Sequence, residues 1–176
     1  MRIARLGSAM PHPASGLPPS DATAGFPELA ARLDAAAHRL PGLALDAATR
    51  VDPTLTERHD EIMLRRFLRD YDGHLKQLST ALATGEDRFV TFYGESLVPV
   101  YRRRHVRMND VVTLLRGLED AALAIVPAAE AEPLRAMMTV WIERMRHHRR
   151  LAGDHQGNAA ARFVFKGVGL GDDTVV

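Results

Sequence analysis

Apolar residues recur at spacings of three and four along the middle of the chain. The most regular stripe consists of Leu64, Phe67, Leu68, Tyr71, Leu75, Leu78 and Leu82. Such a stripe predicts an amphipathic helix with one buried face. We expect this helix to begin near Thr54, because Thr54 and Glu57 have the spacing of a capping box. Gly85 is a suitable C-cap, and Gly73 within the stripe predicts a kink or a break.

Two neighbouring segments show the same periodicity. A short helix is expected after Pro27, and "LPG" at 40–42 is expected to end it, because proline cannot continue a helix. Residues 86–104 predict another helix. Pro99 lies inside this segment and is expected to bend the helix axis or end its regular hydrogen bonding.

Two more helices are predicted in the C-terminal half. Asn109 is a natural N-cap for a helix with an apolar face from Val111 to Ile125. Pro133 suits the first turn of a last helix, which carries Trp141 on its inner side. No segment of this central part favours a strand, so the predicted fold class is all-α, with about five helices.

The helical periodicity fails at both ends of the chain. Residues 1–24 are rich in Pro, Gly, Ser and Ala, which predicts a flexible arm. Residues 153–176 are mostly irregular in pattern, although Phe163 and Phe165 alternate as in a short strand, and this tail is a candidate docking segment. The sequence therefore predicts one helical domain over residues 25–152.

Composition and the absence of known motifs exclude several kinds of functional site. The chain has 176 residues, a formal net charge of +1 and no cysteine, which excludes disulfides, thiolate metal ligands and a cysteine nucleophile. It contains no apolar run long enough for a membrane span and no apolar region typical of a signal peptide, so a cytoplasmic location is expected. The G-x-S-x-G, Walker and H-E-x-x-H motifs are all missing, and an enzyme is not predicted.

Basic residues gather at the ends of two predicted helices. One group is Arg102, Arg103, Arg104, His105 and Arg107, and the other is Arg144, Arg146, His147, His148, Arg149 and Arg150. Cations at helix C-termini are stabilised by the helix dipole by about 0.3–1 kcal/mol each, which is a sufficient reason for both groups. If the two helices end at the same pole, they also form one positive surface for an acidic partner. Its candidate residues are Arg102, Arg103, Arg107, Arg146, Arg149 and Arg150. Nucleic acid is disfavoured, because no exposed aromatic residues are interleaved with the arginines.

One long segment resembles a known family. The stretch "RRFLRDYDGHLKQLSTALATGEDRFVTFYGESLVPVYRRRHVRMNDVVTLLRGLEDAALAIVP" is similar to the N-terminal modules of RsbR- and RsbRD-type bacterial stress-signalling proteins. The shared features are an aromatic-rich first helix, the "TGEDRFVTFY" entry, a basic helix end and "MNDVVTLLRGLEDAAL" before a long last helix. The resemblance implies a globin-like, haemless all-α fold that dimerises and serves a sensory or regulatory role.

We therefore predict a non-enzymatic module that binds a small ligand or a protein partner and signals by repacking its helices in a homodimer. No cofactor is the first expectation. The alternative is a globin-like protein that binds haem or another tetrapyrrole non-covalently. His105 would then be the axial iron ligand, because it precedes the penultimate long helix, and it is the sole metal-ligand candidate. The candidate cofactor-binding residues are His105, His74, Tyr101, Arg104 and Trp141. The methionines around Trp141 suit a small apolar ligand.

Overall fold

The computed structural model describes residues 20–151, and within this range the side chains of 149–151 are not described. The described residues form seven α-helices and a short 3-10 helix, with no strand. The elements are α1 (Pro27–Ala35), α2 (Leu40–Val51), α3 (Leu55–Arg58), α4 (Glu61–Thr84), α5 (Arg88–Arg103), α6 (Met108–Leu123), η1 (Ala128–Glu130) and α7 (Ala131–Leu151). The prediction of an all-α fold is confirmed. The predicted tail, with Phe163 and Phe165, and most of the predicted arm lie outside the described residues.

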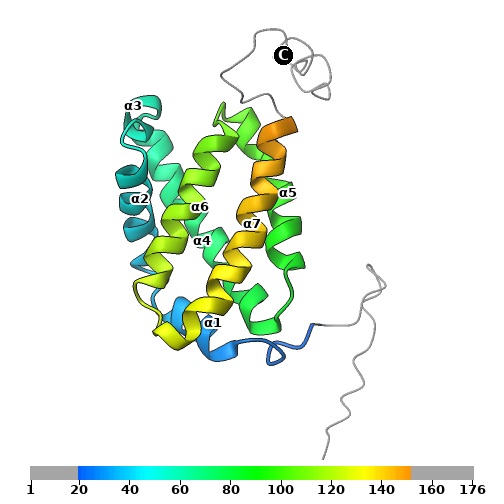
Figure 1. Cartoon of the computed structure of the whole chain (residues 1–176). Helices are drawn as coiled ribbons and strands as arrows, with labels where there is room; N and C mark the ends of the chain where they lie inside the picture. The colour runs from blue at the N-terminus through cyan, green and yellow to red at the C-terminus, as the bar shows by residue number, and fades with distance from the viewer. Residues whose placement is uncertain (1–19, 152–176) are drawn as a thin grey trace, which may run out of the picture.

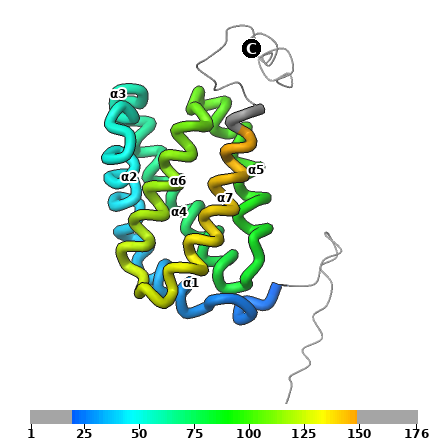
Figure 2. Tube along the Cα trace, viewed as in Figure 1, coloured from blue at the N-terminus to red at the C-terminus, as the bar shows by residue number. Residues whose placement is uncertain are grey.

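The long helices run alternately up and down, as Figure 1 shows. α4 and α6 run toward the end of the bundle where α1 lies, and α2, α5 and α7 run the opposite way. α2 packs against α6, α6 against α7, α7 against α5 and α5 against α4, while α1 closes one end by packing against α4. The tube in Figure 2 follows the same path and shows that α5 and α7 finish at the same end of the bundle.

Large side chains from three helices form the centre of the core. Phe67 and Tyr71 on α4, Tyr101 on α5 and Trp141 on α7 are all buried. The Tyr71 hydroxyl donates a hydrogen bond of 2.9 Å to the carbonyl oxygen of Leu114, which ties α4 to α6. Burial of a large apolar side chain stabilises the fold by about 1.5–3 kcal/mol. Tertiary packing of the apolar stripes therefore holds the helices together more than helix propensity does.

Small residues line the contact between α2 and α6. Gly117 on α6 faces Ala44 and Ala48 on α2. A Cβ atom added at Gly117 would lie 2.3 Å from the carbonyl oxygen of Ala44 and 2.7 Å from the amide nitrogen of Ala48. The two backbones therefore approach as closely as they do because position 117 has no side chain.

The expectation that "LPG" at 40–42 ends a helix is wrong. α1 ends at Ala35, and α2 begins at Leu40, so Pro41 lies in the first turn of a new helix. Amides in the first turn have no acceptor within the helix, and proline at this place costs no hydrogen bond. The same residues that suggested a stop therefore start α2.

The predicted capping box is also wrong. Thr54 precedes the separate helix α3, and its side chain makes no cap hydrogen bond, because its hydroxyl donates to Asp52 at 2.6 Å instead. The cap of α4 is Asp60, whose carboxylate accepts a hydrogen bond of 2.8 Å from the amide of Met63. A neighbouring carboxylate thus competes successfully for the hydroxyl on which the predicted cap depended.

Three more predicted boundaries need correction. α4 continues through Gly73, and α5 continues past Pro99 to Arg103, so neither residue ends its helix. Asn109 is the second residue of α6, and the N-cap position belongs to Arg107. The predicted end of α4 is confirmed, since Gly85 follows its last residue with a φ of 71°.

α5 ends with a histidine where helices usually have glycine. His105 has a φ of 57°. The amide of Val106 donates to the carbonyl of Tyr101 at 2.9 Å, and the amide of His105 donates to that of Arg102 at 2.9 Å. This is the hydrogen-bond pattern of a Schellman motif, with His105 at the left-handed C′ position.

We expect His105→Gly to raise the free energy of unfolding by about 0.5–1 kcal/mol, because glycine adopts the left-handed conformation without the steric cost of a Cβ atom. Urea unfolding of the two proteins measures this difference. Gly85→Ala is the matched control at the end of α4 and should lower stability by about 1 kcal/mol. A His105→Gly protein that is less stable than the parent would contradict this reading of the turn.

No helix among the described residues combines the length and the apolar character that a bilayer span requires.

Candidate functional site

Four polar aromatic side chains from three helices meet inside the core. They are His74 on α4, Tyr93 and Tyr101 on α5, and Trp141 on α7, and we call them the His74 cluster. The rings of His74 and Trp141 meet edge to face with centroids 5.5 Å apart, and those of Tyr93 and Trp141 lie 5.9 Å apart. The cluster therefore joins α4, α5 and α7 at one place.

Both ring nitrogens of His74 are engaged by tyrosines of α5. Nδ1 lies 3.1 Å from the hydroxyl of Tyr93, and Nε2 lies 3.2 Å from the hydroxyl of Tyr101. A neutral imidazole donates from one nitrogen and accepts at the other, so one tyrosine accepts while the other donates. His74 thus fixes the position of α5 on α4 through polar contacts inside an apolar core.

Burial keeps the cluster uncharged at neutral pH. His74 is only 1% exposed, and burial lowers its pKa to about 3. Burial and the charge of Asp70 together raise the pKa of Tyr93 to about 12, and burial likewise raises the pKa of Tyr101. In each case the low-polarity surroundings penalise the charged form.

Two glycines make room for the cluster. A Cβ atom at Gly73 would lie 2.6 Å from the hydroxyl oxygen of Tyr93. A Cβ atom at Gly94 would lie 3.0 Å from Nε1 of Trp141 and 3.2 Å from Sδ of Met145. The glycine that was expected to kink α4 therefore serves to admit a tyrosine hydroxyl from α5.

The indole nitrogen of Trp141 lacks a hydrogen bond. Trp141 is completely buried, and among the described residues its Nε1 has no hydrogen-bond partner. An unpaired buried donor costs about 1–3 kcal/mol relative to one that is bonded. The cluster therefore contains an indole N–H without a hydrogen bond beside a histidine whose two ring nitrogens both have one.

An ion pair lies at the edge of the cluster. Arg104, which follows α5, donates a hydrogen bond of 2.7 Å to Asp70 on α4. The guanidinium carbon of Arg104 also lies 6.0 Å from the ring centre of Tyr101. The pair thus links the C-terminal end of α5 to α4 close to the cluster.

The structure brings together most of the predicted cofactor-binding residues, but not the predicted iron ligand. His74 contacts both Tyr101 and Trp141, and Arg104 lies next to Tyr101. His105 is exposed in the turn after α5 and does not join the cluster. Ligation of iron by His74 would require the loss of a tyrosine hydrogen bond, because neither of its nitrogens is open. Within the described residues, no group of three or more metal-ligating side chains is placed to hold a metal ion.

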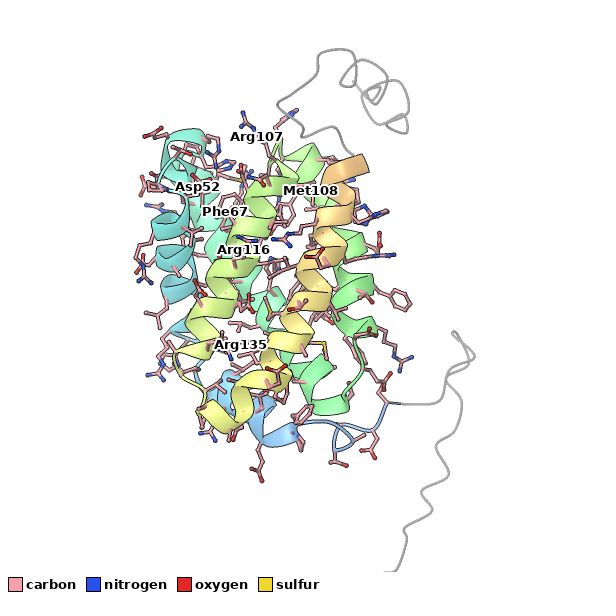
Figure 3. All side chains as sticks on the ribbon, viewed as in Figure 1. Asp52, Phe67, Arg107, Met108, Arg116 and Arg135 are labelled. Atoms are coloured by element: carbon pink, nitrogen blue, oxygen red, sulfur yellow. The ribbon has the colours of Figure 1, made fainter. Side chains whose placement is uncertain are left out.

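The structure shows the side chains of four of the six arginines proposed for partner binding. The ends of α5 and α7 lie at the same end of the bundle (Figure 1), with Arg102 and Arg103 exposed on α5 and Arg107 in the turn before α6 (Figure 3). Arg146 is half-buried and pairs with Glu143 one turn earlier on α7. The side chains of Arg149 and Arg150 lie outside the described residues.

A second polar cluster was not predicted. The carboxylate of Asp110, in the first turn of α6, is 1% exposed and accepts a hydrogen bond of 2.8 Å from Arg58. Its other oxygen lies 2.8 Å from Nε2 of His59, and Arg58 also bonds Asp52 at 2.7 Å. These contacts fasten α3 and the α3–α4 turn to the start of α6. The sequence signal was the adjacent Arg58 and His59, whose partner lies far along the chain.

No protein family model matches the chain, and the comparison with curated proteins gives no match either.

The charge state of His74 predicts a pH-dependent stability. In the unfolded chain its pKa returns to the ordinary value of 6.5, whereas in the folded protein it is about 3. Between these values the unfolded state binds a proton that the folded state does not, so stability falls as the pH falls. Between pH 7 and pH 5, we expect the free energy of unfolding to fall by about 2 kcal/mol more in the parent protein than in His74→Gln. Urea unfolding at both pH values measures this, and equal losses would contradict a neutral, buried His74.

Proposed function

We propose that this chain is a non-enzymatic sensory or regulatory module whose signal is a repacking of α5 and α7 around the His74 cluster. The observation that carries the proposal is the buried indole N–H of Trp141, which lacks a partner among the described residues. Buried donors are almost always bonded in stable cores. A packing that leaves one unbonded is therefore a candidate for exchange with a second packing that satisfies it.

The free energy of one hydrogen bond is of the size needed to exchange the core between two packings. The indole N–H gains about 1–3 kcal/mol if a second packing supplies an acceptor, which is close to the difference that separates a major state from a minor one. An effector that binds one packing better than the other shifts the population accordingly. We propose a small ligand or a protein partner as the effector, in line with the resemblance to RsbR-type modules.

The output surface in this proposal is the outer side of α5 and α7. Phe92 on α5 is 67% exposed, and Val140 on α7 is 38% exposed. Each directly precedes a member of the cluster, Tyr93 or Trp141, so a shift of either helix moves both its surface residue and its core residue. We propose that a second copy of the chain covers these residues in a cytoplasmic homodimer, because burial of exposed apolar side chains favours association.

Replacement of Phe92 by glutamate tests this proposal. We expect the parent protein to be a dimer in light scattering and Phe92→Glu to be a monomer. Ile62→Glu is the control, because Ile62 is 62% exposed but lies on α4. Trp141 is the only tryptophan, so its emission reports on the cluster alone. The emission spectrum should change with dissociation in Phe92→Glu and stay unchanged in Ile62→Glu. A monomeric parent, or dissociation without a change in emission, would contradict the proposal.

A further inference from the structure

A groove opens between α6, α7 and the end of α2. Its volume is about 390 Å³, which is within the range of ligand pockets. It is lined by Val51 at the end of α2, by Arg116, Glu119 and Asp120 on α6, and by Thr139, Ile142, Glu143 and Arg146 on α7. Arg116 is labelled in Figure 3 on α6 beside α7.

The groove combines apolar contacts with an excess of negative charge. Val51 is 53% exposed and provides most of the apolar surface of the groove, because Ile142 is only 6% exposed. Arg146 pairs with Glu143 inside the groove, so that among the lining residues Glu119 and Asp120 face one further cation, Arg116, while Arg135 on α7 also attracts Glu119. Neither Glu119 nor Asp120 forms an ion pair with another residue of the described range. The chemistry that fits is therefore an apolar segment flanked by cations.

We propose that this groove is a docking site for residues 162–166 of the same chain, the sequence Arg-Phe-Val-Phe-Lys. Phe163 and Phe165 are the only phenylalanines after Leu151, and Arg162 and Lys166 flank them. The two phenylalanines match the exposed apolar side chain of Val51. The two cations match the carboxylates of Glu119 and Asp120, and the segment and the groove lining have opposite net charge.

The chain that connects α7 to Phe163 is also long enough to reach the groove. Ile142 lies nine residues before Leu151, which is about 14 Å along the helix axis. At the dimensions typical of a random-coil linker, the twelve residues from 152 to 163 would span about 19 Å as a root-mean-square distance. Effective concentration is highest when the linker span is close to the distance to be bridged. Docking within one molecule is therefore favoured over docking between two copies.

Cross-linking in the full-length protein tests the proposal. The chain has no cysteine, so Val51→Cys and Val164→Cys create a single pair. We expect this pair to form an intramolecular disulfide with oxidised glutathione. Glu119→Lys with Asp120→Lys should slow its formation at least about fivefold, because the acidic wall is lost. Both lysines lie in the C-terminal half of α6, where positive charge favours the helix, so the fold should persist.

The compensating exchange is the decisive control. Arg162→Glu with Lys166→Glu, added to the two lysine substitutions, should restore the original rate of cross-linking, since the charges are then opposite again. Equal rates in all three backgrounds would show chance collision and overturn the proposal. A disulfide that links two chains would overturn it as well, because the occupant would be a second copy. Docking here does not depend on exchange within the His74 cluster, so the two proposals can fail separately.

Discussion

Replacement of Gly117 by alanine is expected to lower the free energy of unfolding by about 3 kcal/mol, at the upper end of the usual cost of overpacking. The added Cβ would meet backbone atoms of α2, at 2.3 Å from the carbonyl oxygen of Ala44 and 2.7 Å from the amide of Ala48. Backbone atoms cannot turn aside as a flexible side chain can. α2 must therefore move away from α6, and the packing of both helices weakens.

Gly42→Ala is the matched control for this substitution. Gly42 lies on α2 as well, but an added Cβ there would meet nothing within 4 Å. Alanine also favours the helix over glycine, so this change should raise stability by about 0.5–1 kcal/mol. Urea unfolding of both variants measures the two effects. A Gly117→Ala protein as stable as the parent would mean that α2 and α6 do not pack as closely as described.

Removal of the Asp110 carboxylate is expected to have the next largest effect. Asp110→Ala leaves Nε2 of His59 without its partner and Arg58 with Asp52 and the hydroxyl of Thr54, and it removes a negative charge from the first turn of α6. Loss of one member of a buried ion pair costs about 3 kcal/mol or more. Chemical unfolding at pH 7 measures the loss.

An exposed ion pair provides the comparison. Arg65 and Glu61 pair on the surface of α4 with most of their side-chain area exposed. Arg65→Ala should therefore change stability by less than about 0.5 kcal/mol. Similar losses for Asp110→Ala and Arg65→Ala would show that the Asp110 pairs contribute no more than a surface contact.

Large apolar side chains made most of the fold predictable. The stripe from Leu64 to Leu82 identified α4, and similar stripes identified α5, α6 and α7. α2 was missed because its contact face is made of Ala44, Ala47 and Ala48, which suit the close approach to Gly117 but give a weak apolar pattern. The start of α4 was misplaced because the partner of Thr54 is Asp52, a local competitor that the capping-box pattern does not consider.

The candidate site was predictable as a set of residue types but not as an arrangement. The sequence singled out His74, Tyr101 and Trp141, and these residues do meet. Their hydrogen bonds depend on how α4, α5 and α7 pack, and no sequence spacing specifies that geometry. The same limit applies to Asp110, which is 51 residues from His59. His105 was favoured from its position in the chain order of helices, yet its backbone conformation places it in an exposed turn.

The proposed repacking around the His74 cluster is tested most directly by looking for exchange of Trp141 between two environments. Nitrogen-15 relaxation dispersion at the indole N–H reports motion on the microsecond to millisecond timescale. Since Trp141 is the only tryptophan, one indole resonance is expected and needs no further assignment. We predict that exchange contributes to the transverse relaxation rate of this nitrogen. This contribution should change in Tyr93→Phe, which removes one of the two hydroxyls that hold His74. A flat dispersion profile in both proteins would show a single fixed packing and would contradict the account.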